Sequence, residues 1–175
     1  MSDVDPDRPH IVILGLMGVG KSTVAEALAE RLGRPVADSD RDIERLTGVT
    51  GRTYAEASGV PALHRLEAAV LLGALARPEP TVVSAAASTV EDPQVRQLLG
   101  RRATVVRLVA DIELTIDRQR AGGHRRPMDP EELIDLAARR EPMFSAVEDL
   151  RVDANRRPVE IVADIGRFLG PPMGR

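Results

Sequence analysis

The chain has 175 residues, 43% hydrophobic and 29% charged, which predicts one folded domain over residues 1–175 and excludes a chain that is disordered by composition. It contains no cysteine, so disulfides, thiolate nucleophiles and thiolate metal ligands are excluded. The net charge of −3 and the 2% of aromatic residues argue against nucleic-acid binding, and no apolar run reaches the ~18 residues of a spanning helix, so we expect a cytoplasmic protein with no membrane contact.

The first predicted elements are a strand and a helix joined by a glycine-rich turn. An apolar, β-branched run begins at His10 and lies between Pro9 and Gly15, which predicts a buried strand. From Lys21 the apolar residues recur at helical spacing as far as Gly33, which is a typical helix terminator. The chain therefore opens with a strand, a turn and a helix.

The rest of the chain continues this alternation of strands and helices. Further strands are predicted at 36–38, 81–85, 104–110 and 150–153, and helices at about 40–47, 61–76, 93–99, 111–121, 130–147 and 158–169. Continuously apolar strands that alternate with helices are typical of a parallel sheet covered on both faces. We expect a three-layer α/β/α fold with a central parallel sheet of about five strands. Residues 122–130, rich in chain breakers and arginine, predict either a mobile lid or an ordinary surface loop.

The glycine-rich turn carries the strongest chemical signal. Residues 15–22, GLMGVGKS, match the P-loop pattern GxxxxGK[ST], with a strand before it and a helix after it. Of the 24 basic residues only Lys21 is a lysine, so a chance match would have to include the chain's single lysine. We expect this segment to bind a nucleoside triphosphate, with Lys21 on the β- and γ-phosphates and the Ser22 hydroxyl on Mg²⁺. The expected nucleotide contacts here are Gly18, Val19, Gly20, Lys21, Ser22 and Thr23.

Two carboxylates follow the second predicted strand, where the ligand crevice of a parallel sheet lies. Asp38 could hold Mg²⁺, while Asp40 could orient an acceptor hydroxyl or take its proton. An N-cap at Asp40 is an alternative that is compatible with this role. A calcium loop is excluded, because Ile43 and Val49 stand where glycine and glutamate would be needed.

At this point the sequence resembles the shikimate kinase family. The resemblance rests on 15–23, DSD at 38–40 and IERLTG at 43–48, and on HRLE at 64–67, RP at 126–127, REPMF at 140–144 and VDANRRP at 152–158. It implies a P-loop fold like that of nucleoside monophosphate kinases, with a helical substrate-binding insertion at about 39–68 and a lid at about 122–130. It also implies a monomeric enzyme that uses ATP and Mg²⁺ to convert shikimate to shikimate 3-phosphate in aromatic amino acid biosynthesis.

The resemblance further implies a role for individual residues. Lys21, Asp40 and Arg126 would be catalytic, with Arg126 closing onto the transferred phosphoryl group. Arg140 would pair with the acceptor carboxylate through its guanidinium fork. Three further residues would flank the adenine: Arg120, Arg156 and Pro158.

Two departures from the family pattern concern the acceptor. His64 stands where the family has a second carboxylate-binding arginine, and a neutral imidazole cannot make a bidentate clamp. Ala85, Ala86 and Ala87 stand where the family has three glycines that touch the substrate, so a reshaped turn or pocket is expected. In the alternatives, His64 is a surface residue beside Glu67 and the strand simply continues through the alanines.

These departures leave more than one function open. The acceptor could be a different cyclitol or sugar acid, and a non-catalytic nucleotide-binding regulator is a further alternative. The complete set of Lys21, Ser22, Asp38, Asp40 and Arg126 argues against the regulator. A nucleoside monophosphate kinase would need more arginine in the insertion to hold its acceptor phosphate.

Overall fold

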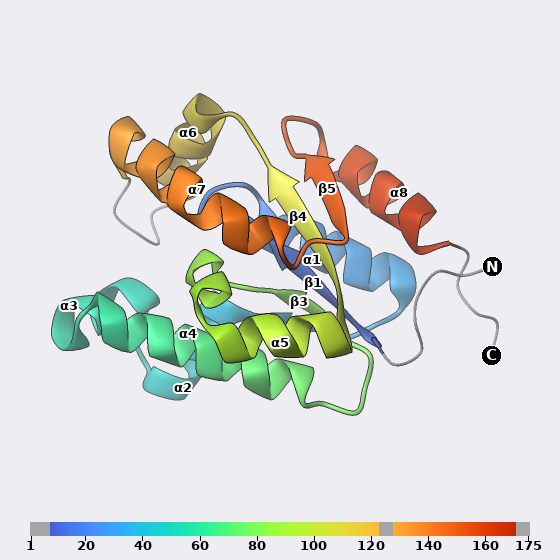
Figure 1. The fold of residues 1–175 in the computed structure, drawn as a ribbon, viewed down its shortest axis with the longest axis horizontal. Helices are drawn as coiled ribbons and strands as arrows, with labels where there is room; N and C mark the ends of the chain where they lie inside the picture. The colour runs from blue at the N-terminus through green and yellow to red at the C-terminus, as the bar shows by residue number, and fades with distance from the viewer. Residues whose placement is uncertain (1–7, 123–127, 171–175) are drawn as a thin grey trace.

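The computed structural model describes residues 8–122 and 128–170, and their strands form one parallel sheet in the order β2-β3-β1-β4-β5 (Figure 1). The strands are β1 (His10–Leu14), β2 (Val36–Asp38), β3 (Val82–Ser84), β4 (Ala103–Val109) and β5 (Leu150–Asp153). The predicted parallel sheet of about five strands between helices is confirmed.

The helices of the described residues connect these strands. They are α1 (Lys21–Leu32), α2 (Ser39–Thr47), α3 (Gly51–Ser58), α4 (Val60–Leu75), the 3₁₀ helix η1 (Ala87–Glu91), α5 (Pro93–Arg102), α6 (Ile112–Gly122), α7 (Pro130–Ser145) and α8 (Pro158–Leu169). The sequence did not predict α3 or η1. The other predicted helices and strands are present; β2, β5 and α8 have the predicted bounds, and the bounds of the rest differ by one to three residues.

The middle strand β1 shows why the sheet has helices on both faces. Its side chains alternate between two apolar clusters, and all five of its residues are buried. Ile11 and Ile13 pack with residues of α1 and α8, whereas Val12 and Leu14 pack with residues of α4 and α5. Figure 1 shows these two pairs of helices on opposite faces of the sheet. A strand buried on both faces needs a continuous apolar run, which residues 11–14 of β1 provide.

The loops that leave the carboxyl ends of the strands form the functional end of the fold. The glycine-rich turn follows β1, α2 begins directly after β2, and the three alanines follow β3. Ligands of open parallel sheets bind at this end. Helices α2 and α3 and the start of α4 occupy the range predicted as a substrate-binding insertion. None of the helices in the described ranges is long and apolar enough to cross a membrane.

Candidate functional site

The turn between β1 and α1 requires glycine at two positions. Gly15 has φ +143°, and a Cβ there would lie 2.5 Å from the Leu108 carbonyl oxygen. Gly18 has φ +87°, and a Cβ there would lie 2.6 Å from the Thr115 carbonyl oxygen. Both positions combine a backbone conformation that side chains disfavour with close contact to a neighbouring chain segment. The turn therefore packs tightly against β4 and α6 before α1 begins at Lys21.

Two side chains of α6 form hydrogen bonds to the backbone of this turn. The Arg118 guanidinium donates from Nη1 to the carbonyl oxygens of Val19, at 3.1 Å, and Ala154, at 3.3 Å. Gln119 Nε2 donates to the Met17 carbonyl oxygen at 2.9 Å. The bonds to Val19 and Met17 tie α6 to the turn, and the bond to Ala154 ties it to the segment after β5. The sequence analysis did not single out Arg118 or Gln119.

The start of α1 brings together the polar side chains expected at a nucleotide phosphate site. Lys21 Nζ donates to the Leu16 carbonyl oxygen at 3.0 Å, so its ammonium group is folded over the turn. The Ser22 hydroxyl donates to Asp38 Oδ2 at 2.6 Å and lies 3.4 Å from the Ser84 hydroxyl. Hydroxyl and carboxylate oxygens from three neighbouring segments thus meet beside Lys21.

Asp38 also determines where α2 begins. Its Oδ1 accepts hydrogen bonds from the backbone N–H groups of Asp40, at 3.1 Å, and Arg41, at 3.3 Å. Asp38 is therefore the N-cap of α2, and the alternative N-cap at Asp40 is wrong. Asp40 stands in the first turn of α2, at the positively polarised end of the helix.

The three alanines after β3 are buried but are not part of the strand, so the alternative of a strand continuing through them is wrong. Ala86 has φ −64° and ψ 142°, and no non-glycine residue of the described chain has a positive φ. The Ala86 N–H donates to the Ser39 hydroxyl oxygen at 3.2 Å, which ties this segment to α2. The turn is thus built without the left-handed conformations that only glycine adopts readily.

The far end of the site is formed by α4, η1 and α7. Arg140 of α7 is buried and donates from Nε to Glu91 Oε1 at 2.7 Å. His64 of α4 has its Nδ1 3.8 Å from Glu91 Oε2. Glu67, one turn after His64, is fully buried and accepts a hydrogen bond from the Ser88 hydroxyl. His64 therefore faces Glu91 of η1, and its side chain is 34% exposed.

One cavity of about 790 Å³ joins these parts. The predicted site residues that line it are Gly18, Val19, Gly20, Lys21, Ser22, Thr23, Asp38, Asp40, His64, Ala85, Ala86, Ala87, Arg140, Arg156 and Pro158. They come from the carboxyl ends of four strands and from α4, α7 and the start of α8. The same cavity is lined by the P-loop and by Arg140, and a site that binds two substrates needs such an arrangement.

Of the remaining two predicted site residues, one lies away from the cavity and the other lies outside the described residues. Arg120 is 65% exposed and lies 3.7 Å from Asp117, so the structure places it on the surface of α6, whereas Arg118 lines the cavity. Arg126 and most of the expected lid at 122–130 lie outside the described residues. Arg156 lines the cavity and pairs with Asp164, which raises the pKa of the guanidinium.

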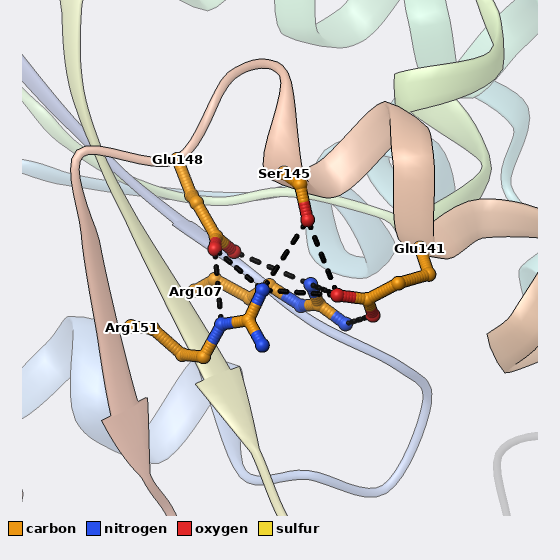
Figure 2. A network of polar contacts seen from close by, with 5 residues as sticks. All are labelled: Arg107, Glu141, Ser145, Glu148 and Arg151. Carbon is orange, nitrogen blue, oxygen red and sulfur yellow. Dashed lines mark hydrogen bonds and ion pairs between the residues drawn. The ribbon is translucent and has the colours of Figure 1, made fainter.

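A polar network next to Arg140 fixes α7 to the sheet (Figure 2). Arg107 of β4 donates from Nη1 to Glu141 Oε1 at 3.1 Å and to Glu148 Oε2 at 3.3 Å. Arg151 of β5 donates to the same two glutamates. The Arg107 hydrogen bond holds the pKa of Glu141 at about 2, below its ordinary 4.5. The network joins β4, β5 and α7, so it sets the position of Arg140 over the cavity.

Comparison with known proteins decides the family. The family model described as shikimate kinase matches residues 17–169. The chain belongs to the shikimate kinase family. The shikimate kinase of Symbiobacterium thermophilum is 38% identical over 163 residues, which is 89% of this chain and 93% of that protein. The shikimate kinase of Chromohalobacter salexigens is 35% identical over 165 residues, 91% of each chain.

A solved structure of the shikimate kinase family resembles this fold along almost its whole length. The shikimate kinase from Acinetobacter baumannii in complex with shikimate superposes with a TM-score of 0.84, at 30% identity and over 94% of each chain. The expected family and the expected P-loop kinase fold are both confirmed. The departures at His64 and Ala85 to Ala87 are therefore variations within a shikimate kinase fold.

Proposed function

We propose that this chain transfers the γ-phosphoryl group of ATP to the 3-hydroxyl of shikimate. The observation that carries the proposal is the single cavity that joins the P-loop to Asp40 and Arg140. At the phosphate end, the P-loop and Lys21 can bind a triphosphate. Beyond it, the Asp40 carboxylate can bind an acceptor hydroxyl and the Arg140 guanidinium can bind an acceptor carboxylate. Relatives that cover about nine-tenths of the chain are named shikimate kinase, which supports the same acceptor.

The residues would divide the reaction between them. The P-loop N–H groups and Lys21 would hold the β- and γ-phosphates, and Asp40 would orient the acceptor hydroxyl and accept its proton as the oxygen attacks phosphorus. Arg140 would pair with the acceptor carboxylate and so fix the ring in one orientation. Arg126 is proposed to neutralise charge on the transferred group. Positioning and charge stabilisation would supply most of the acceleration.

Ser22 and Asp38 fit a magnesium site. The hydroxyl and carboxylate oxygens lie 2.6 Å apart at the phosphate end of the cavity, and Mg²⁺ prefers oxygen ligands. The described residues contain no group of three acidic, histidine or cysteine side chains around one point, which suits a cation that takes most of its ligands from phosphates and water. When bound, the ion would supply charge neutralisation between the β- and γ-phosphates.

The test is ADP release with ATP and Mg²⁺, compared without acceptor and with shikimate, quinate, gluconate and a small set of cyclitols. The phosphorylated product is confirmed by mass. We expect turnover with shikimate that exceeds the acceptor-free rate by at least about 100-fold, since positioning the hydroxyl removes most of the cost of bringing two reactants together. Turnover of another acid or cyclitol but not of shikimate would refute the assigned acceptor. ATP binding with no turnover of any acceptor would instead support a nucleotide-binding regulator.

A further inference from the structure

Glu91 forms an ion pair with Arg140, the residue that the proposed function assigns to the acceptor carboxylate. Its Oε1 accepts a hydrogen bond from Arg140 Nε and also lies 2.7 Å from Arg140 Nη2. Nε and Nη2 form one of the edges with which a guanidinium holds a carboxylate. That edge is already engaged by a carboxylate of the same chain.

The pair changes the charge that the cavity presents at this end. Arg140 lines the cavity and its side chain is 8% exposed, so its charge is poorly screened by water. Glu91 is the last residue of η1, and its side chain is 41% exposed. With Glu91 ionised, the pair contributes no net charge to the recognition of an acceptor.

His64 lies beside the same carboxylate. Its Nδ1 lies 3.8 Å from Glu91 Oε2, so the imidazole faces the same carboxylate from the α4 side. Glu91 is thus placed between the only two basic side chains, His64 and Arg140, that line the acceptor end of the cavity in the described residues. A negative charge there opposes the binding of a second carboxylate.

We propose that Glu91 is a specificity-determining residue that weakens the preference of this site for a carboxylate over a neutral group of the same shape. The inference rests on the proposed function, because it takes Arg140 as the acceptor's partner. The site is then expected to accept neutral analogues of shikimate as well as shikimate itself, which carries a carboxylate.

The test compares shikimate with its carboxamide, which replaces the carboxylate by a neutral group of similar size. Glu91→Gln keeps an oxygen acceptor for Arg140 Nε but removes the negative charge. We expect kcat/KM for shikimate to rise about fivefold or more through a lower KM, because a like charge near the acceptor is removed. The value for the carboxamide is expected to stay within about twofold, because a neutral acceptor gains nothing from that charge change.

Two controls separate the charge from other effects. Glu30→Gln makes the same change of formal charge on an exposed position of α1 and is expected to leave both acceptors unchanged. If Glu91 only holds Arg140 in place, Glu91→Gln will be neutral and Glu91→Ala will impair both acceptors equally. That result, or an equal gain for both acceptors, would overturn the proposal.

Calorimetric titration of shikimate into each protein keeps the inference separable from the proposed function. Tighter binding of shikimate by Glu91→Gln than by the original chain supports the role of Glu91 even if neither protein turns shikimate over. Absence of turnover in the original chain counts against the proposed function alone. Equal shikimate affinity in both proteins counts against the role of Glu91.

Discussion

The Ser22 hydroxyl donates to Asp38 Oδ2 at 2.6 Å, and this bond ties α1 to the start of α2 at the phosphate end of the cavity. The other oxygen of Asp38 accepts the N–H of Asp40 at 3.1 Å. One buried carboxylate therefore contacts both the residue expected to face the phosphates and the residue expected to face the acceptor hydroxyl.

Asp40→Asn is predicted to reduce turnover while ATP binding is retained. The bond between Asp38 and position 40 uses the backbone N–H, so the start of α2 is preserved in the variant. Loss of a base and of its charge is expected to lower kcat by about 100-fold or more. The check is kcat from ADP release beside the ATP Kd from calorimetry. Full activity of the variant would show that Asp40 has no role in the transfer.

Lys21→Arg is predicted to be nearly as inactive as Lys21→Ala. The Lys21 ammonium folds over the P-loop to reach the Leu16 carbonyl oxygen at 3.0 Å, and a planar guanidinium is too large for this position. Removing a charged donor from the transferred group is expected to cost about 100- to 1,000-fold in kcat. An exposed arginine that is changed to lysine, Arg31→Lys at the end of α1, serves as the matched control. Substantial activity of Lys21→Arg would mean that only the charge at this position matters.

The strand, turn and helix around the P-loop were predictable because the apolar period changes from that of a buried strand to that of a helix at the glycines. The conformation of the loop after β3 was not predictable. Alanine is unfavourable in such a loop only where φ is positive, and Ala86 adopts φ −64°. Helix α3 was missed because its eight residues are mostly polar and lie between glycines. The one local signal for it was Thr50, whose hydroxyl caps the helix by accepting the Thr53 N–H at 3.2 Å.

Long-range partners account for the rest of what the sequence could not predict. Arg118 lies 99 residues from Val19 in the chain, and only the folded structure brings its guanidinium to the P-loop carbonyl. Glu91 lies 49 residues from Arg140, in a 3₁₀ helix that no sequence pattern indicated. Arg120 was expected from the family resemblance, but Arg118 lines the cavity instead, and helical spacing alone does not show which arginine faces it.

Glu141 is predicted to make the stability of the fold depend on pH in the acid range. The hydrogen bond from Arg107 lowers the pKa of Glu141 from 4.5 to about 2 in the folded chain. The stabilisation is therefore complete above the ordinary pKa and is lost as the pH falls from about 4.5 toward 2. Because this side chain is 44% exposed, the effect at pH 7 is expected to be about 1 kcal/mol or less.

The measurement is urea unfolding of the original chain and Glu141→Gln at pH 7 and at pH 3. The difference in free energy of unfolding between the two proteins is expected to be larger at pH 7 than at pH 3. Glu30→Gln, at an exposed position of α1, is the control and is expected to show a difference near zero at both values. A difference that grows as the pH falls would contradict the assignment of Glu141 as an ionised partner of Arg107.

His64→Arg is predicted to strengthen the binding of shikimate, and Glu91 is predicted to limit the gain. An arginine at this position can form a bidentate pair with the acceptor carboxylate, but Glu91 Oε2 lies 3.8 Å from the present imidazole and would compete for the new guanidinium. We expect the single variant to lower KM by about threefold, and the double variant with Glu91→Gln to lower it by more than the product of the two single effects. KM for shikimate measured across this double-mutant cycle, with His64→Gln as the uncharged control, checks the coupling. If the two single effects simply multiply, Glu91 does not act on the basic residue at position 64, and its influence is confined to Arg140.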